Sequence, residues 1–131
     1  MRNIFIAGSS KQRQVIHVLI HELKAQGYES FDWTQHPGFT TGDYLPEDVA
    51  NEDLNAVKEC DGLVWAIGES SSGAPFEAGY AMATGKPVVV LWLIPPSGPV
   101  AKHTVYAHVF EQTTSLADAV RKIEDRLGAA I

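Results

Sequence analysis

The stretch of sequence that decides the fold is residues 62–93, which read GLVWAIGESSSGAPFEAGYAMATGKPVVVLWL. It begins and ends with apolar runs, residues 62–67 and 87–93, which are typical of parallel strands covered on both faces. Residues 75–84 between them have a helical pattern, and Gly85 follows where a C-terminal cap is expected. The stretch therefore predicts a strand–helix–strand unit with two parallel strands.

The flanking sequence continues this alternation of strands and helices. Three further apolar runs are candidate strands: residues 3–7, 28–33 and 105–110. Helical patterns cover the segments between and after these runs, namely residues 11–26, 46–58 and 115–127. The last of these helices repeats apolar residues at helical spacing and is expected to turn them inward: Leu116, Val120, Ile123 and Leu127.

Five strands alternating with helices predict one α/β domain over residues 1–131. We expect a doubly wound, parallel five-stranded sheet of the flavodoxin-like or Rossmann-like type, with the strand order 2-1-3-4-5. In such sheets, ligands bind outside the carboxyl ends of the strands, at the switch point between strands 1 and 3. The loops expected there are residues 8–11 and 68–76.

Composition excludes several classes of partner. The chain has 131 residues, of which 45% are hydrophobic and 20% charged, and its formal net charge is −6 at pH 7. Its Lys and Arg residues are scattered, which argues against a nucleic acid polymer or an anionic membrane as partner. The single cysteine, Cys60, cannot form an internal disulfide, and it is expected in the core or as a spacer. With no apolar run long enough to be a signal peptide, the expected location is the cytoplasm.

A serine-rich turn after the central strand leads to Glu77. Because a helix N-terminus carries partial positive charge, an acid in the first helical turn is expected to be ionised, as a carboxylate nucleophile must be. First-turn acids are common without any function, so this position alone does not decide the matter. Asp53 lies on the helix that leads into the same strand, and because nothing in the local sequence sets it apart, a solvated helix acid is the better interpretation of it by itself.

The first turn of the chain offers a second candidate site. Gly8, Ser9, Ser10 and Lys11 open the first helix, where backbone N–H groups, hydroxyls and one ammonium group can hold a phosphate. The sequence is neither a GxGxxG fingerprint nor a P-loop, and a serine that only caps the helix is the alternative. Among the histidines, His17 and His21 are spaced like metal ligands, but the sequence shows no third ligand. We therefore predict no metal and no cofactor.

Three stretches together resemble the nucleoside 2-deoxyribosyltransferase family, which includes the 2'-deoxynucleoside 5'-monophosphate N-glycosidases. They are residues 4–9 (IFIAGS), residues 53–64 with Asp53-Leu54 and CDGLV, and residues 71–88 (SSGAPFEAGYAMATGKPV). The last stretch is the most specific. The resemblance extends over about residues 3–92.

The resemblance implies a role for each matching residue. Glu77 would attack the anomeric carbon of the sugar, and Asp53 would transfer a proton to the departing base. Ser9, Lys11 and Ser71 would hold a 5'-phosphate, with the backbone at Gly8 and Gly73 alongside. It also implies a homodimer or larger homo-oligomer, in which residues 95–99 are a candidate loop lent to a neighbouring subunit.

The chain departs from the family pattern at Phe5, a candidate substrate contact, where a tyrosine is expected to orient the nucleophile. Tyr44 is a candidate for supplying the missing hydroxyl, and Trp33 is a candidate for stacking on a base, although it reads equally as a core residue.

The favoured activity is N-glycosidic bond cleavage of a (deoxy)nucleoside or nucleoside 5'-monophosphate by hydrolysis. The alternatives are a nucleoside 2-deoxyribosyltransferase that exchanges bases, and a non-catalytic domain that binds or senses a nucleotide.

Overall fold

The computed structural model describes residues 2–36, 46–68, 73–94 and 111–129. Within these residues the fold is built on a four-stranded parallel sheet in the order β1-β2-β3-β4. The strands are β1 (Ile4–Ala7), β2 (Gly62–Ile67), β3 (Val88–Trp92) and β4 (Glu111–Thr113). The central strands are apolar along their length because helices cover both faces, and this confirms the predicted strand–helix–strand unit.

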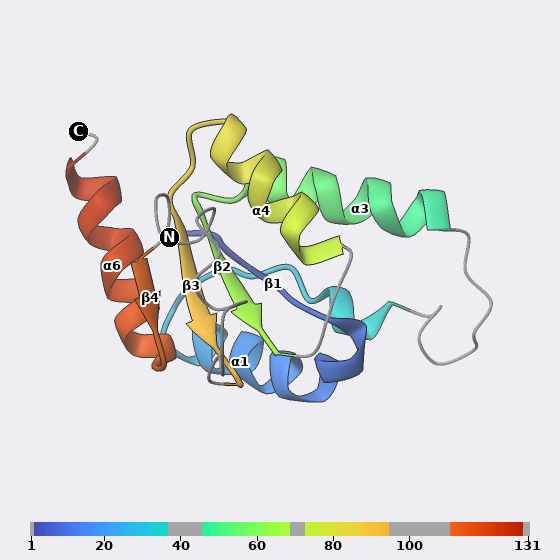
Figure 1. Ribbon diagram of the computed structural model, residues 1–131, viewed down its shortest axis with the longest axis horizontal. Coiled ribbons are helices and arrows are strands. Elements are labelled where there is room, and N and C mark those ends of the chain that lie inside the picture. The colour runs from blue at the N-terminus through green and yellow to red at the C-terminus, as the bar shows by residue number, and fades with distance from the viewer. Residues whose placement is uncertain (1, 37–45, 69–72, 95–110, 130–131) are drawn as a thin grey trace, which may run out of the picture.

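The helices form two layers around this sheet (Figure 1). They are α1 (Arg13–Ala25), α3 (Pro46–Glu59), α4 (Gly73–Ala83) and α6 (Leu116–Ala129), with short 3₁₀ turns η1 (Ser10–Gln12) and η2 (Trp33–Gln35). Helices α3 and α4 lie side by side on one face, and α1 crosses the opposite face against β1. Helix α6 packs against β3 and β4. None of the helices in the described ranges is long and apolar enough to cross a membrane.

The predicted second strand, residues 28–33, is largely absent. Only Glu29 pairs with the sheet, through an isolated parallel bridge to Asn3 at the edge beside β1. The chain then turns, because the Asp32 side chain accepts a hydrogen bond from the backbone N–H of Thr34 and caps η2. The bridge lies where strand 2 of the predicted 2-1-3-4-5 order belongs, so the order of segments is kept although the strand is not.

The predicted fifth strand, residues 105–110, lies outside the described residues, as do Tyr44 and the candidate loop at residues 95–99. Directly after it, Glu111–Thr113 forms β4 and pairs in parallel with β3. A last parallel strand therefore stands next to β3, as the predicted order requires. The helix that follows turns Leu116, Val120 and Ile123 into the core, as its spacing predicts.

The core lies between the sheet and its helices. Its largest fully buried side chains come from β1, α1, β2 and α6: Phe5, Ile4, Ile6, Ile16, Ile20, Leu23, Leu63 and Ile123. Cys60 is buried beside them, and burial raises the pKa of its thiol to about 11. A thiol with that pKa stays protonated and inert near neutral pH, which fits the predicted core role.

Candidate active site

Helices α3 and α4 enclose a cavity of about 200 Å³ between them. Both predicted catalytic carboxyl groups line it, one from each helix. The lining residues are Ala50, Asp53, Leu54, Gly73, Phe76 and Glu77. A cavity that is mostly apolar and holds two converging carboxyl groups matches the usual composition of a small-molecule site.

Glu77 differs from its expected state. Helix α4 begins at Gly73, earlier than predicted, and no acidic residue lies in its first turn. Glu77 therefore lies one turn further in, where the helix dipole has little effect. Burial, and then the charge of Asp53, raise the pKa of Glu77 to about 8. Oε2 is buried without a hydrogen-bond partner among the described residues. The expectation that Glu77 lies in the first helical turn, where the helix N-terminus would stabilise its ionised form, is wrong.

Asp53 is half-buried rather than solvated. Burial and the charge of Glu52 raise its pKa to about 6, while the nearby His36 lowers it. The interpretation of Asp53 as an ordinary solvated helix acid is therefore wrong. Burial thus raises the pKa of both carboxyl groups, so each holds its proton to a higher pH than a solvated carboxyl group does.

His36 is a residue near the site that sequence reasoning missed. Its Nε2 lies 3.1 Å from Glu52 Oε2, and its charge acts on the neighbouring Asp53. His36 directly follows η2 in the chain. It lies beside α3, although the stretch of chain between His36 and α3 is outside the described residues. No local pattern marks it, because only the tertiary fold brings it to α3.

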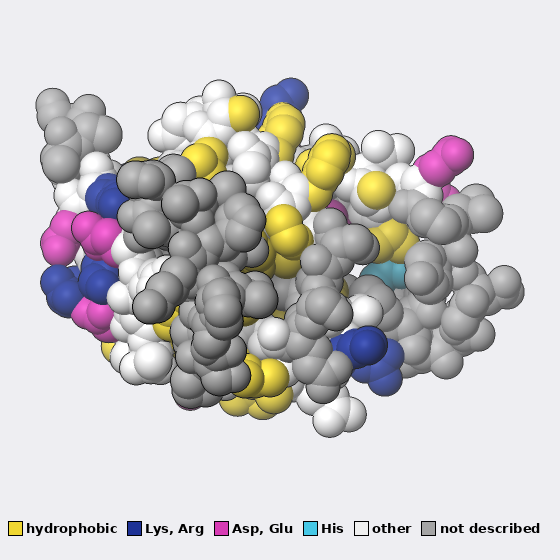
Figure 2. All heavy atoms as spheres, in the orientation of Figure 1, with side chains coloured by type: hydrophobic (Ala, Val, Ile, Leu, Met, Phe, Trp, Pro, Cys, Tyr) yellow, Lys and Arg dark blue, Asp and Glu magenta, His cyan; other side chains and the backbone are white. Residues whose placement is uncertain are grey.

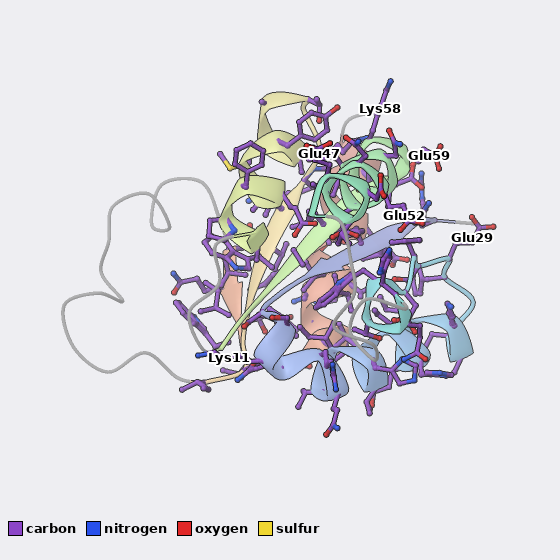
Figure 3. The ribbon with its side chains drawn as sticks, turned by 90° about the vertical axis from the view of Figure 1, so that its right-hand side faces the viewer. Lys11, Glu29, Glu47, Glu52, Lys58 and Glu59 are labelled. Carbon is purple, nitrogen blue, oxygen red and sulfur yellow. The ribbon has the colours of Figure 1, made fainter. Side chains whose placement is uncertain are left out.

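The predicted phosphate contacts gather at the first turn after β1. Ser9 is buried and caps η1, its hydroxyl accepting the backbone N–H of Lys11 at 3.2 Å. Lys11 is exposed at this turn and lies at the lower left of Figure 3, whereas Glu47 and Glu52, on α3, lie above it and to its right. The hollow lined by Lys11 shares no lining residue with the Asp53–Glu77 cavity. Ser71 lies outside the described residues.

Two glycines join this turn to the neighbouring elements. A Cβ on Gly8 would lie 2.1 Å from Ile16 Cδ1, so β1 and α1 approach closely there. A Cβ on Gly68, just after β2, would lie 1.8 Å from Gln12 Oε1. The Gln12 side chain therefore lies against the backbone of Gly68 at the switch point. Its Oε1 is buried with no hydrogen-bond partner among the described residues. No sequence pattern marks Gln12 as a residue of the site.

The two aromatic residues predicted to touch the substrate belong to the core. Phe5 is 1% exposed in β1, and Trp33 is 6% exposed with its Nε1–H donated to the carbonyl of Ile6 at 2.7 Å. Neither lines the Asp53–Glu77 cavity. Their contact with a substrate stays a prediction.

One aromatic side chain does lie at the cavity and at the surface. Phe76 lines the cavity and is 70% exposed. Figure 2 shows hydrophobic side chains gathered over α4, the helix that carries both Phe76 and Glu77. An exposed aromatic ring next to a buried carboxyl group offers a flat apolar surface to a ligand.

Among the solved structures that have a similar fold, two are named as enzymes. The CMP N-glycosidase BcmB of Clostridium botulinum has a TM-score of 0.59 and 23% identity, covering 94% of this chain and 98% of that chain. A 2-deoxyribosyltransferase of Bacillus psychrosaccharolyticus has a TM-score of 0.64 and 19% identity, covering 88% of each chain. The solution structure of BlsM has a TM-score of 0.70 and 24% identity, covering 97% of this chain and 94% of that chain. These similarities show the shared α/β fold.

Comparison of the sequence with known families shows more than the shared fold. No curated protein sequence matches the chain significantly. The sequence profile described as nucleoside 2-deoxyribosyltransferase matches residues 4–94, well over half of the chain, and this range includes β1, both cavity helices and both carboxyl groups. The chain belongs to the nucleoside 2-deoxyribosyltransferase family of enzymes.

Proposed function

We propose that the protein cleaves the N-glycosidic bond of a (deoxy)nucleoside or nucleoside 5'-monophosphate, with retention, through a glycosyl-Glu77 intermediate. The observation that carries this proposal is the pair of carboxyl groups, Asp53 and Glu77, in one partly apolar cavity with both pKa values raised. Retaining glycosidases use two such groups, one as nucleophile and one as acid and then base.

The first step forms one bond and breaks another. The Glu77 carboxylate attacks the anomeric carbon, the carbon–nitrogen bond breaks, and its electron pair leaves with the base. Asp53 donates a proton to that base, which leaves more easily when neutral. In the second step the Asp53 carboxylate takes a proton from water as the water oxygen attacks the anomeric carbon, and the bond from that carbon to the Glu77 oxygen breaks, so Glu77 is released as a carboxylate.

This chemistry needs one proton on the pair, and the raised pKa values of both groups favour keeping a proton there. Burial and the charge of Asp53 raise the pKa of Glu77 to about 8, which favours a proton on Glu77. Catalysis requires it on Asp53. Positive charge that develops on the sugar beside Glu77 favours the ionised form of that group, and this moves the proton toward Asp53.

Hydrolysis is favoured over base exchange because of the first turn. Ser9 and Lys11 at η1 supply a hydroxyl and a cation where backbone N–H groups already favour an anion, which suits a nucleoside 5'-monophosphate. The structurally similar BcmB is named as a CMP N-glycosidase, whereas another similar protein is a 2-deoxyribosyltransferase. A non-catalytic nucleotide-binding domain is the further alternative, favoured by Phe5 in place of the family tyrosine.

The direct test replaces the nucleophile. Glu77→Gln should lower base release from nucleosides and monophosphates by several powers of ten, since a catalytic nucleophile typically contributes that much. The matched control is Glu47→Gln, an exposed acid at the start of α3, which should keep the wild-type rate. Each protein is assayed with and without a free second base, so that water and base acceptors are compared. A Glu77→Gln rate above about a tenth of wild type contradicts the proposal.

A second substitution tests the phosphate contact. Lys11→Ala should weaken kcat/KM for a nucleoside 5'-monophosphate by about 1.5–3 kcal/mol, the range for a hydrogen bond to a charged group. The unphosphorylated nucleoside should lose little. Lys58→Ala, which removes an exposed lysine from the end of α3, is the control. Equal losses on both substrates would assign Lys11 to stability or to the sugar, and would favour the transferase.

A further inference from the structure

The structure supplies the third ligand that the sequence lacked around His17 and His21. The two histidines lie one turn apart on α1, and their rings meet edge to face with centroids 4.5 Å apart. Asp32, from the separate segment that begins η2, places Oδ2 at 2.7 Å from His17 Nδ1. One ligand atom from each of the three residues lies within 4.8 Å of the others.

The carboxylate in this cluster is held in place by its own segment. Asp32 Oδ1 accepts hydrogen bonds from the backbone N–H of Thr34 at 3.1 Å and from the Thr34 hydroxyl, which leaves Oδ2 toward His17. The side chain of Asp32 is 13% exposed and that of His17 is 32% exposed. Two of the three ligands are therefore already positioned, while His21 at the surface remains accessible to an ion.

The ligand set fits a particular class of ion. Two imidazoles and one carboxylate suit Zn²⁺ and other late transition-metal ions, whereas Mg²⁺ and Ca²⁺ require more oxygen ligands. Tetrahedral zinc with bonds of ~2.0–2.1 Å holds its ligand atoms about 3.3 Å apart. Binding such an ion therefore requires the His21 ring to turn inward and His17 to separate slightly from Asp32. Three protein ligands leave one position for water.

We propose that His17, His21 and Asp32 form a transition-metal site for an ion such as Zn²⁺, which ties α1 to the segment that carries η2. None of the three residues lines the Asp53–Glu77 cavity. The site is therefore independent of the proposed glycosidase chemistry. A metal ion bound there would nevertheless hold in place the segment that leads to His36, whose charge acts on Asp53.

The test measures metal binding itself. Full-length, tag-free protein is stripped with a chelator, dialysed and titrated with ZnCl₂ at pH 7.4 by calorimetry and by competition with a chromophoric zinc indicator. The expected result is one Zn²⁺ per chain with a dissociation constant in the micromolar range. At 100 times that constant, Zn²⁺ should raise the Tm of the wild-type protein, because ligands that bind only the folded state stabilise it.

Variants assign the ligands. His21→Gln should weaken Zn²⁺ binding at least tenfold and abolish the rise in Tm, and since His21 is exposed the variant is expected to fold. Two controls should bind Zn²⁺ as the wild type does: Glu22→Gln, its neighbour on α1, and His36→Gln, the same chemical change elsewhere. No binding by the wild-type protein, or equal binding by wild type and His21→Gln, overturns the proposal.

Discussion

Glu77 and Asp53 show at the scale of single residues how burial sets the chemistry of a carboxyl group. The same side chain on an exposed helix would be ionised at neutral pH, but here the lost hydration raises the pKa of both groups. Their positions were predictable from sequence through the family motif. Their raised pKa values were not, because these depend on where α4 begins and on how α3 and α4 pack.

This electrostatic arrangement predicts a pH-dependent stability. The folded-state pKa of Glu77, about 8, lies above its ordinary value of 4.5, so folding disfavours the ionised form. The associated stability is fully present below about pH 4.5 and is lost as the pH rises through 8. Glu77→Gln, which cannot ionise, should therefore be more stable than wild type at pH 9, by on the order of a few kcal/mol.

Thermal unfolding of both proteins at pH 4 and pH 9 measures this difference. The gain should be absent at pH 4, where Glu77 is protonated in both the folded and the unfolded state. Glu47→Gln, at an exposed position, should show no gain at either pH. A gain in Tm of Glu77→Gln that is equal at both pH values would contradict the burial of an ionisable Glu77.

At the scale of elements, the sequence located helices better than it located edge strands. The four long helices lie within a few residues of their expected bounds because helical spacing and capping residues are local signals. The segment at residues 28–33 has an apolar and aromatic composition typical of a strand, yet Asp32 caps η2 and turns the chain. A side chain that competes for backbone hydrogen bonds is not visible in an apolar pattern.

The contact between β1 and α1 gives an element-scale prediction. Gly8→Ala places a Cβ 2.1 Å from Ile16 Cδ1 and 3.3 Å from the carbonyl oxygen of Ala66, so it should destabilise the protein by about 1–3 kcal/mol. Ile16→Val removes that Cδ1 and should relieve the clash, so the double variant should be more stable than the sum of the single effects predicts.

Chemical unfolding of the two single variants and the double variant measures this coupling. Gly79→Ala in α4 is the control, because no atom lies within 4 Å of its added Cβ, and it should be neutral or stabilising by up to about 1 kcal/mol. Purely additive effects of Gly8→Ala and Ile16→Val would show that the two residues do not meet as the structure has them.

For the whole molecule, alternation of strand and helix was enough to predict a parallel α/β domain. The observed order β1-β2-β3-β4, with the Glu29 bridge outside β1, keeps the switch point beside β1 and β2. Two groupings were beyond the sequence: His36 beside Asp53, and Asp32 beside His17. Each grouping brings together residues from separate segments of the chain. Because these segments carry no shared motif, only the tertiary structure reveals the groupings.

The account as a whole rests on a covalent intermediate at Glu77. The most direct measurement is a rapid-quench single turnover with a nucleoside 5'-monophosphate, followed by proteolysis and mass spectrometry of the peptides. The account predicts a transient peptide containing Glu77 whose mass is increased by the glycosyl group, formed as the base is released and absent from Glu77→Gln. Base release at the full rate without any adduct, or an adduct that persists in Glu77→Gln, would contradict it.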